Sequence, residues 1–336
     1  MDFLNAFVAV SNYVLIPAVA YGSQLALGAL GVTLIYGILR FSNFAHGDTM
    51  AFGAMSTILV TWWFQSMGIS AGPLPTALIA LPFGILLTAA LVLATDRTVY
   101  RFYRQVKAKP IVFVMASIGI MFILNGLVRF IIGPGEQRFA DGARFIIKAR
   151  DFKDWTGLSE GLALRTTQVI TVVTAVIVVA ALFWFLNRTR TGKSMRAFSD
   201  NEDLALLSGI NPERVVRVTW LIVAALATIA GTLYGLDKVF KPFTYFQLVL
   251  PIFASAIVGG LGNPLGAIAG GFLIAFSEVT VTYAWKKVLI YLMPDSLEPS
   301  GLVQLLSTDY KFAVSFAILV VVLLFKPTGL FKGKSV

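Results

Sequence analysis

The chain has 336 residues, of which 57% are hydrophobic and 13% are charged, and its formal net charge is +10 at pH 7. Soluble domains typically carry about 25% charged residues, so this composition excludes a soluble enzyme and indicates an integral membrane protein. The basic residues are spread over many loops, which disfavours a nucleic-acid-binding surface. The chain has no cysteine, which excludes a disulfide framework and a thiolate metal site.

The apolar runs, taken in chain order, predict the membrane-spanning helices, because a helix needs about 20 apolar residues to cross the hydrocarbon. The first run contains no basic residue before Arg40, so it lacks the basic region of a cleavable signal peptide and we expect it to be retained. Two pieces, 49–65 and 247–260, are short enough to be tilted helices or half-helices. The predicted spans are 14–39, 49–65, 75–95, 111–133, 167–187, 216–236, 247–260, 264–285 and 312–326.

The predicted fold is all-α: a polytopic integral membrane protein with about eight or nine membrane segments, including short or broken helices. No polar segment is long enough for a second core, so residues 1–336 are predicted to form a single transmembrane domain. Basic residues cluster in the loops at 96–110 and 188–217 and in the C-terminal tail, and the positive-inside rule places these on the cytoplasmic side. The N-terminus and the polar loop at 134–166 are then expected outside, and the C-terminus in the cytoplasm.

A polar stretch, RFSNFAHGDTM (residues 40–50), separates the first two apolar runs. It holds His46, the only histidine of the chain, with Asn43, Asp48 and Gly47, a glycine that permits an irregular turn. An unpaired carboxylate facing lipid costs about 2.5–3.5 kcal/mol, so Asp48 is not expected to face lipid. Two structures remain open: a cytoplasmic turn with its charged residues at the surface, or a break at membrane depth that lines a cavity. A single histidine without cysteine partners does not predict a metal site.

The predicted cytoplasmic loop at 188–217 contains Gly192-Lys193-Ser194, which matches the end of a phosphate-binding P-loop. That motif requires an earlier glycine where Asn187 stands, and it follows a strand, whereas this segment follows a membrane span. The sequence therefore predicts no nucleotide site and no ATP hydrolysis by this chain.

A separate short helix is predicted inside this loop, at residues 199–209. Ser199 and Glu202 fit a capping box, and Gly209 fits a left-handed helix end. Asn211, followed by proline, then fits the N-cap of the next span. Two interpretations of the short helix remain: a solvated connector, or a docking element whose exposed leucines receive the movement of a partner.

A second interruption, IVGGLGNPLGAIAGG (residues 257–271), lies between the last apolar runs. Interrupted segments in corresponding halves of a chain are typical of a central site in transporters. The alternative is ordinary helix packing through small residues. Asn125 and Glu278 are polar residues in apolar runs; each either joins two helices or lines a polar path, and the first interpretation is favoured for Asn125.

Four segments resemble signatures of one known family, the permease subunits of branched-chain amino-acid ABC importers of the LivH type. The resemblance runs through most of the chain and is specific because several signatures occur together. The second of these segments looks like the part of such permeases that contacts their ATPases. The segments are GVTLIYGILRFSNFAHGDTMAFGA (31–54), RAFSDNEDLALLSGINPERV (196–215), IVGGLGNPLGAIAGG (257–271) and LLFKPTGLF (323–331).

This resemblance implies a multi-pass subunit of the bacterial inner membrane, surrounded by membrane lipid, that pairs with a second, related permease. Two cytoplasmic ABC ATPases, which bind ATP and Mg, would power the pair, and a periplasmic solute-binding protein would deliver the solute. The chain itself would need no cofactor. The implied solutes are leucine, isoleucine and valine, or related small solutes such as other amino acids, urea or short amides.

Two segments depart from the family pattern. The residues at 249–253 (VLPIF) replace the Gly-Leu-Lys-Ala-Phe that commonly precedes the glycine-rich signature, and Tyr310-Lys311-Phe312 replaces a frequent Tyr-Lys-Asp. Neither departure changes the predicted fold, but both leave the solute open.

The predicted functional residues form two groups. A zwitterionic amino acid needs donors for its carboxylate, such as a helix N-terminus, and acceptors for its ammonium group, such as Asn43, Asp48 or backbone carbonyls. The alternative function, an ion-gradient-driven secondary transporter of a small solute, shares the broken helices but does not predict the 196–215 segment. The predicted solute-path residues are Asn43, His46, Gly47, Asp48, Gly260, Gly262, Asn263, Pro264 and Glu278, and the predicted ATPase-coupling residues are Arg196, Ser199, Asp200, Glu202, Leu206, Gly209 and Ile210.

Overall fold

The computed structural model describes residues 2–139, 141–293, 299 and 301–331, and most of them are helical. Its strands form one short antiparallel pair. The elements in chain order are α1 (Asp2–Val10), the π-helical turn η1 (Ser11–Leu15), α2 (Ile16–Leu39), α3 (His46–Ser66), α4 (Ala77–Thr95), the π-helical turn η2 (Asp96–Tyr100), α5 (Arg101–Gln105), α6 (Pro110–Ile132), β1 (Phe145–Ile147), α7 (Ala149–Thr156), β2 (Leu164–Arg165), α8 (Thr166–Arg188), α9 (Arg190–Asp200), α10 (Glu202–Leu207), α11 (Pro212–Lys238), α12 (Pro242–Gly259), α13 (Pro264–Thr282), α14 (Lys286–Leu292), the 3-10 turn η4 (Thr308–Tyr310) and α15 (Lys311–Phe325).

Eight helical segments in the described part of the chain are long and apolar enough to cross a membrane, which confirms the predicted all-α polytopic fold. The helix α3 is a ninth long helix, but its first turn carries His46 and Asp48 and lowers its hydropathy. The eight segments are Asp2–Leu39, Ala77–Gln105, Pro110–Ile132, Thr166–Arg188, Pro212–Lys238, Pro242–Gly259, Pro264–Thr282 and Thr308–Phe325.

The first span begins earlier than the predicted residue 14, because α1, η1 and α2 form one continuous helical segment from Asp2 to Leu39. The polar residues in its first part find partners in a distant loop. The Asn5 side-chain oxygen accepts from the Glu160 backbone N–H at 3.1 Å, and that of Asn12 accepts from the Ala163 N–H at 3.0 Å. The sequence predicted too short a helix, because it does not show that these polar side chains have partners in a distant loop.

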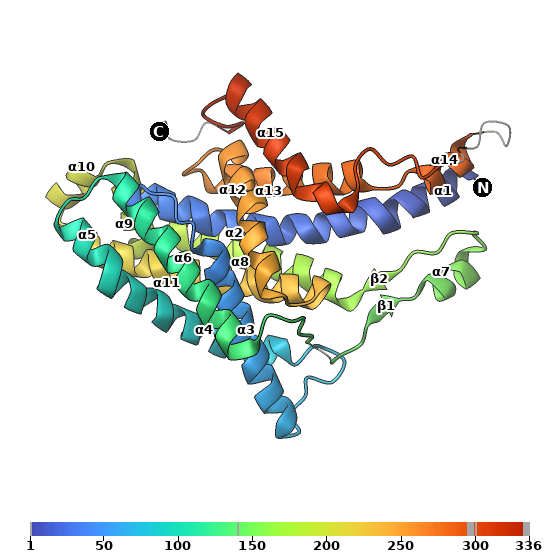
Figure 1. Ribbon diagram of the computed structural model, residues 1–336, viewed down its shortest axis with the longest axis horizontal. Helices are drawn as coiled ribbons and strands as arrows, with labels where there is room; N and C mark the ends of the chain where they lie inside the picture. Colours follow the sequence, from blue (N-terminus) through green and yellow to red (C-terminus); the bar gives the residue numbers. More distant parts are fainter. Residues whose placement is uncertain (1, 140, 294–298, 300, 332–336) are drawn as a thin grey trace.

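The helix α2 lies at the centre of the bundle, with 19 of its 24 residues buried. It packs against α8, α11, α12 and α13, and Figure 1 shows it running along the long axis of the molecule. Small residues allow this contact: a side chain at Gly271 would meet the backbone of Ala26 at 2.7–2.8 Å. Close approach of helices at small residues is the usual packing mode in membranes.

The loops gather at two opposite ends of the molecule (Figure 1). The first, which we call the α10 end, carries α5, α9, α10, the 260–263 turn and the C-terminal residues 329–331, whose backbone bonds to the end of α12. The other, which we call the α14 end, carries α1, α14 and the 134–166 loop with β1, α7 and β2. The basic loops 96–110 and 188–217 thus share an end, as the charge pattern predicts.

A buried carboxylate fastens the 134–166 loop to α14. Glu160 accepts hydrogen bonds from Lys287 Nζ at 2.7 Å and from the Tyr291 hydroxyl at 2.7 Å. Burial raises the pKa of the Glu160 carboxyl, but these hydrogen bonds and the charge of Lys287 outweigh it and hold the pKa below its usual value. These contacts hold the part of the loop around Glu160 against α14.

Candidate functional site

Two short helices, α9 and α10, form the segment at the α10 end that the sequence singled out. The helix α9 begins after Thr189, whose side chain accepts from the Gly192 N–H at 3.0 Å. The N-cap of α10 is Asn201, which accepts from the Leu204 N–H at 3.0 Å. Gly209 follows α10 with φ +78°, as predicted.

The predicted capping box of Ser199 with Glu202 is wrong, and so is a single helix over 199–209. Ser199 lies in the last turn of α9, and Glu202 is the first residue of α10, which ends at Leu207. The start of the next span is confirmed, because Asn211 accepts from the Arg214 N–H at 3.2 Å and Pro212 is the first residue of α11.

The end of α9 is hydrogen-bonded to the end of the central helix α2. Ser199 Oγ donates to the Gly37 carbonyl at 2.9 Å, and Arg40 Nη2 donates to the Ser199 carbonyl at 2.6 Å. Arg40 ends α2 with φ 56°, a left-handed conformation that is uncommon for a residue with a side chain. The two bonds join one residue of α9 to two residues at the end of α2.

The outer surface of α10 carries three exposed leucines. Leu204, Leu206 and Leu207 are 61%, 43% and 85% exposed, whereas Ala205 is buried against the bundle. Ile210 is half-buried, and Glu202 and Gly209 are exposed. A short helix that presents leucines outward while its other face is fixed is suited to contact another protein.

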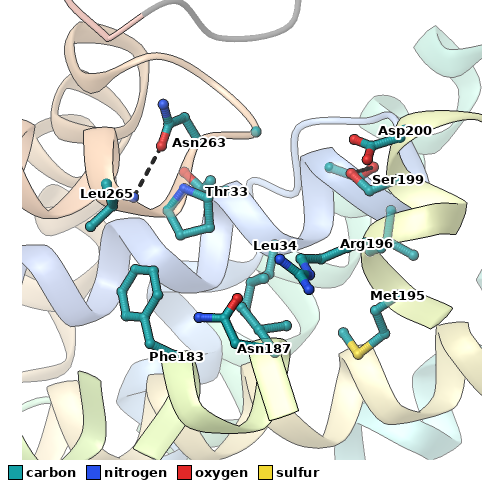
Figure 2. Close-up of a pocket in the computed structure, with 15 residues that line it drawn as sticks. Thr33, Leu34, Phe183, Asn187, Met195, Arg196, Ser199, Asp200, Asn263 and Leu265 are labelled. Atoms are coloured by element: carbon teal, nitrogen blue, oxygen red, sulfur yellow. Dashed lines mark hydrogen bonds between the residues drawn. The ribbon is translucent and has the colours of Figure 1, made fainter. Parts of the chain in front are cut away.

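A cavity of about 390 Å³ lies between α2, α8, α9, the 260–263 turn and the start of α13 (Figure 2). Figure 2 shows the Arg196 guanidinium directed into it, toward Leu34 and Asn187. Ser199 and Asp200 line the same cavity. The cavity therefore brings predicted coupling residues together with three residues of the predicted solute path: Gly262, Asn263 and Pro264.

The second interruption is a short turn at this end, between α12 and α13. Asn263 is the N-cap of α13 and accepts from the backbone N–H groups of Leu265 and Gly266 at 3.1 and 3.2 Å, while its Nδ2 donates to the Phe331 carbonyl at 2.8 Å. Gly260 and Gly262 have φ values of 110° and 82°, which favour glycine. All polar groups of Asn263 are used in holding the turn.

The first interruption combines the two structures that the sequence left open. Arg40 lies exposed at the end of α2, and the chain from 41 to 45 then runs back into the bundle without helical structure. The helix α3 begins at His46, whose ring packs on Gly31 so closely that a Cβ at Gly31 would overlap it. Gly31 lies about two turns before the end of α2, so α3 starts inside the bundle.

Two polar side chains of this buried junction, those of Asn43 and Asp48, accept hydrogen bonds within the protein, whereas the ring nitrogens of His46 and Oδ2 of Asp48 have no hydrogen-bond partner among the described residues. Asn43 Oδ1 accepts from the Ala45 N–H at 3.1 Å and from the Tyr100 hydroxyl at 3.2 Å. Asp48 is fully buried, and its Oδ1 accepts from Asn125 Nδ2 at 2.7 Å. Asn125 therefore joins two helices, as favoured from the sequence. His46, Gly47 and Asp48 belong to the first turn of α3, so the irregular part of the stretch is shorter than predicted.

The predicted solute-path residues do not form one site in the structure. Asn43, His46, Gly47 and Asp48 lie together at the buried junction. The 260–263 turn and Pro264 lie near the C-terminal end of α2, where Gly262 approaches Gly37. Glu278 lies in a separate cavity at the α14 end. Sequence symmetry between the two interruptions therefore does not correspond to one shared location.

Three residues of interest escaped the sequence analysis as site candidates: Gly37, Tyr21 and Lys311. Gly37 is recognisable only through its contact with Ser199. Tyr21 and Lys311 line the cavity that contains Glu278. Lys311 lies in one of the two segments that depart from the family pattern, and this departure could have marked it as a candidate site residue.

The fold and these contacts define a class: a multi-span membrane transport subunit with a polar junction inside its bundle and an accessory helix at one end. A family model described as "Branched-chain amino acid transport system / permease component" matches residues 14–323. The chain belongs to this family, and it is a permease subunit of the ABC importer class.

Individual relatives agree with this assignment. The chain is 31% identical to the high-affinity branched-chain amino acid transport system permease protein LivH of Escherichia coli K12, covering 93% of this chain and 92% of that protein. It is 27% identical to the corresponding permease protein BraD of Pseudomonas aeruginosa, with 94% of each chain covered. A fructose import permease protein, FruG of Bifidobacterium longum, is 27% identical over 53% of this chain and 55% of that protein. The predicted family is confirmed, and the permease subunit belongs to a transport family rather than a catalytic one.

Proposed function

We propose that this subunit imports a small amino acid by alternating access, driven through α9 and α10 by ATPases that it does not contain. The observation that carries the proposal is the pair of hydrogen bonds from Ser199 and Arg40 that join α9 to the end of α2. The same α2 packs on His46 at the buried junction. A movement received at α10 therefore has a short, rigid route to that junction.

The ABC transport system to which the family belongs implies ATPase and solute-binding partners. In the arrangement we propose, two cytoplasmic ATPases bind ATP and Mg, and one of them contacts the exposed leucines of α10. A second, related permease completes the membrane domain, and a periplasmic binding protein docks at the α14 end. The α10 end and the C-terminus then face the cytoplasm, and the N-terminus lies outside.

The proposed coupling residues act by position. Leu206 contributes to the contact surface of α10, Gly209 sets the angle between α10 and α11, and Ile210 anchors the connection. Arg196 and Asp200 border the cavity beside α9, which changes shape if α9 moves. Branched-chain amino acids are the proposed solutes on the basis of the similarity to LivH and BraD. Because the chain is also similar to the fructose permease FruG, other small solutes should be tested in the same uptake assay.

Reconstitution into liposomes tests the driving force. We expect leucine uptake that requires the cognate ATPases, the binding protein and ATP together. Uptake by this permease driven by a proton or sodium gradient without ATPases would contradict the proposal and favour an ion-coupled transporter.

A substitution at Gly209 tests the coupling route. A side chain at φ +78° costs about 1–2 kcal/mol, and the space around Gly209 is open, so Gly209→Val alters only the connection between α10 and α11. We expect ATP hydrolysis to continue while uptake falls. Gly209→Asn is the matched control, because asparagine tolerates this conformation, and it should retain uptake. Equal uptake in both variants would argue against this route.

A further inference from the structure

A second cavity, of about 250 Å³, lies at the α14 end, on the far side of the bundle from α10. Its walls come from η1, α2, α13, the end of α11 and the start of α15. Pockets for drug-sized ligands measure about 300–1,000 Å³, so this one suits a smaller molecule. Its lining combines one buried acid, two lysines and an aromatic and aliphatic wall. The residues are Tyr13, Pro17, Tyr21, Lys238, Glu278, Val279, Thr282, Tyr283, Thr308 and Lys311.

Glu278 places an incompletely paired carboxylate in this cavity. The residue is 1% exposed, and the Ser315 hydroxyl donates to its Oε1. Its Oε2 has no hydrogen-bond partner within 3.5 Å in the described part of the chain. A buried carboxylate oxygen without a partner is costly, so this oxygen is available to a ligand that brings a donor.

Lys311 supplies the opposite charge without contacting Glu278. Its Nζ lies 5.5 Å from the centre of the Tyr21 ring and 4.7 Å from that of Phe312. The ion pairs within 4.0 Å among the described residues do not include Glu278 with Lys311. Lys238, the other lysine of the lining, pairs with Asp237 at 3.2 Å. The cavity is therefore lined by the Glu278 carboxylate and the Lys311 ammonium group, which do not form an ion pair with each other.

The remaining wall is suited to an apolar side chain. Tyr13 and Tyr283 stack with ring centres 6.1 Å apart, and Pro17 and Val279 add aliphatic surface. A separated pair of opposite charges beside an apolar wall matches a free α-amino acid with a hydrocarbon side chain. A sugar can hydrogen-bond to these groups but carries no charge that would form an ion pair with either of them.

We infer that this cavity is an amino-acid-binding subsite on the α14 side of the permease. The carboxylate of the ligand pairs with Lys311, its ammonium group donates to Glu278, and its side chain packs on Tyr13 and Tyr283. The inference rests on the proposed function in one respect, that amino acids are the solutes that reach this end. It adds a site distant from the buried junction, where a solute released outside would bind before crossing.

Equilibrium binding of radiolabelled leucine to the purified permease in phosphatidylcholine nanodiscs tests this directly. We expect saturable binding without ATPases, ATP or binding protein. Lys311→Met and Glu278→Gln should each weaken it about tenfold to a hundredfold, because each removes a hydrogen bond to a charged group. Lys311→Arg should restore part of the affinity. Leucinamide and 4-methylpentanoate, which each lack one charge, should compete poorly, and fructose should not compete.

The exposed ion pair of Lys241 with Glu136, 3.8 Å apart and outside the cavity, provides matched controls. Lys241→Met and Glu136→Gln should bind leucine like the natural protein, and thermal unfolding should show that all variants are folded. If Glu278→Gln fails to fold, Lys311→Met and Lys311→Arg still decide the result.

Several results would overturn the inference: no leucine binding, binding unchanged in Lys311→Met, equal competition by fructose, or loss of leucine binding when phosphatidylethanolamine is included. The last would assign the cavity to the primary ammonium headgroup of phosphatidylethanolamine, since phosphatidylcholine, which is present throughout, has no N–H donor. Because the assay contains no ATPase, a failure of coupling through α9 and α10 would leave it unchanged. The two proposals can therefore fail independently.

Discussion

The two interruptions of the apolar sequence, at 40–50 and 257–271, have similar compositions but occupy different environments in the folded protein. Each places glycine and asparagine between long apolar runs. The first leads the chain back into the bundle, where Asp48 and His46 are buried. The second is a turn at the α10 end, with Asn263 half-buried beside the C-terminal residues.

Long-range partners account for the difference. The first interruption is held by α2, α6 and the end of η2, through Gly31, Asn125 and Tyr100. The second is held mainly by its own helix start and by Phe331. A polar break in a membrane sequence therefore marks an irregular backbone, while its depth depends on partners elsewhere in the chain.

The largest expected effect comes from filling the close contact at the first interruption. Gly31→Val places a branched side chain where the His46 ring lies. Because both helices are buried, we expect a loss of more than about 3 kcal/mol and little folded protein. Yield and thermal unfolding in detergent measure this. An unchanged unfolding temperature would show that α3 does not begin against α2.

Removal of the partner of Asp48 should have the next largest effect. Asn125→Leu leaves the buried carboxylate without its 2.7 Å hydrogen bond, at a cost of about 3 kcal/mol. The double variant Asn125→Leu with Asp48→Leu should recover part of that loss, since it removes both polar groups. Additive losses in the two single variants would contradict a direct contact.

Asn43→Ala should cost about 2 kcal/mol. It removes the hydrogen bond from the Ala45 N–H just before α3 and leaves the Tyr100 hydroxyl, which is buried, without this acceptor. Combining it with Tyr100→Phe should reduce the additional loss. Thermal unfolding of the four proteins in a double-mutant cycle measures the coupling, and a coupling of zero would place the two side chains apart.

Asn263→Ala, the counterpart in the second interruption, should cost only about 1 kcal/mol. It removes a helix N-cap at a half-buried position, where water replaces the lost bonds. Asn263→Asp retains the cap and should lose less. If Asn263→Ala destabilised the protein more than Asn43→Ala, the contrast between the two interruptions would be wrong.

Local chemistry in the sequence predicts the spans, the left-handed Gly209 and the N-cap at Asn211. It fails where a distant residue decides the outcome. Ser199 has the right neighbours for a capping box, but its hydroxyl instead bonds to Gly37, far away in the sequence. The cavity around Glu278 could not be predicted either, because Tyr21, Glu278 and Lys311 come from three separate helices.

The central claim is that α9 moves together with α2, and a reversible cross-link tests it most directly. A Cβ at Gly37 lies 3.3 Å from Ser199 Oγ, close enough for a disulfide, and the natural chain has no cysteine to interfere. The variant with Gly37→Cys and Ser199→Cys is reconstituted with its ATPases and binding protein, and leucine uptake is measured before and after reduction. We predict that the oxidised and reduced forms transport equally. Loss of uptake on oxidation, restored by a reductant, would show that α9 must slide on α2 and would contradict the account.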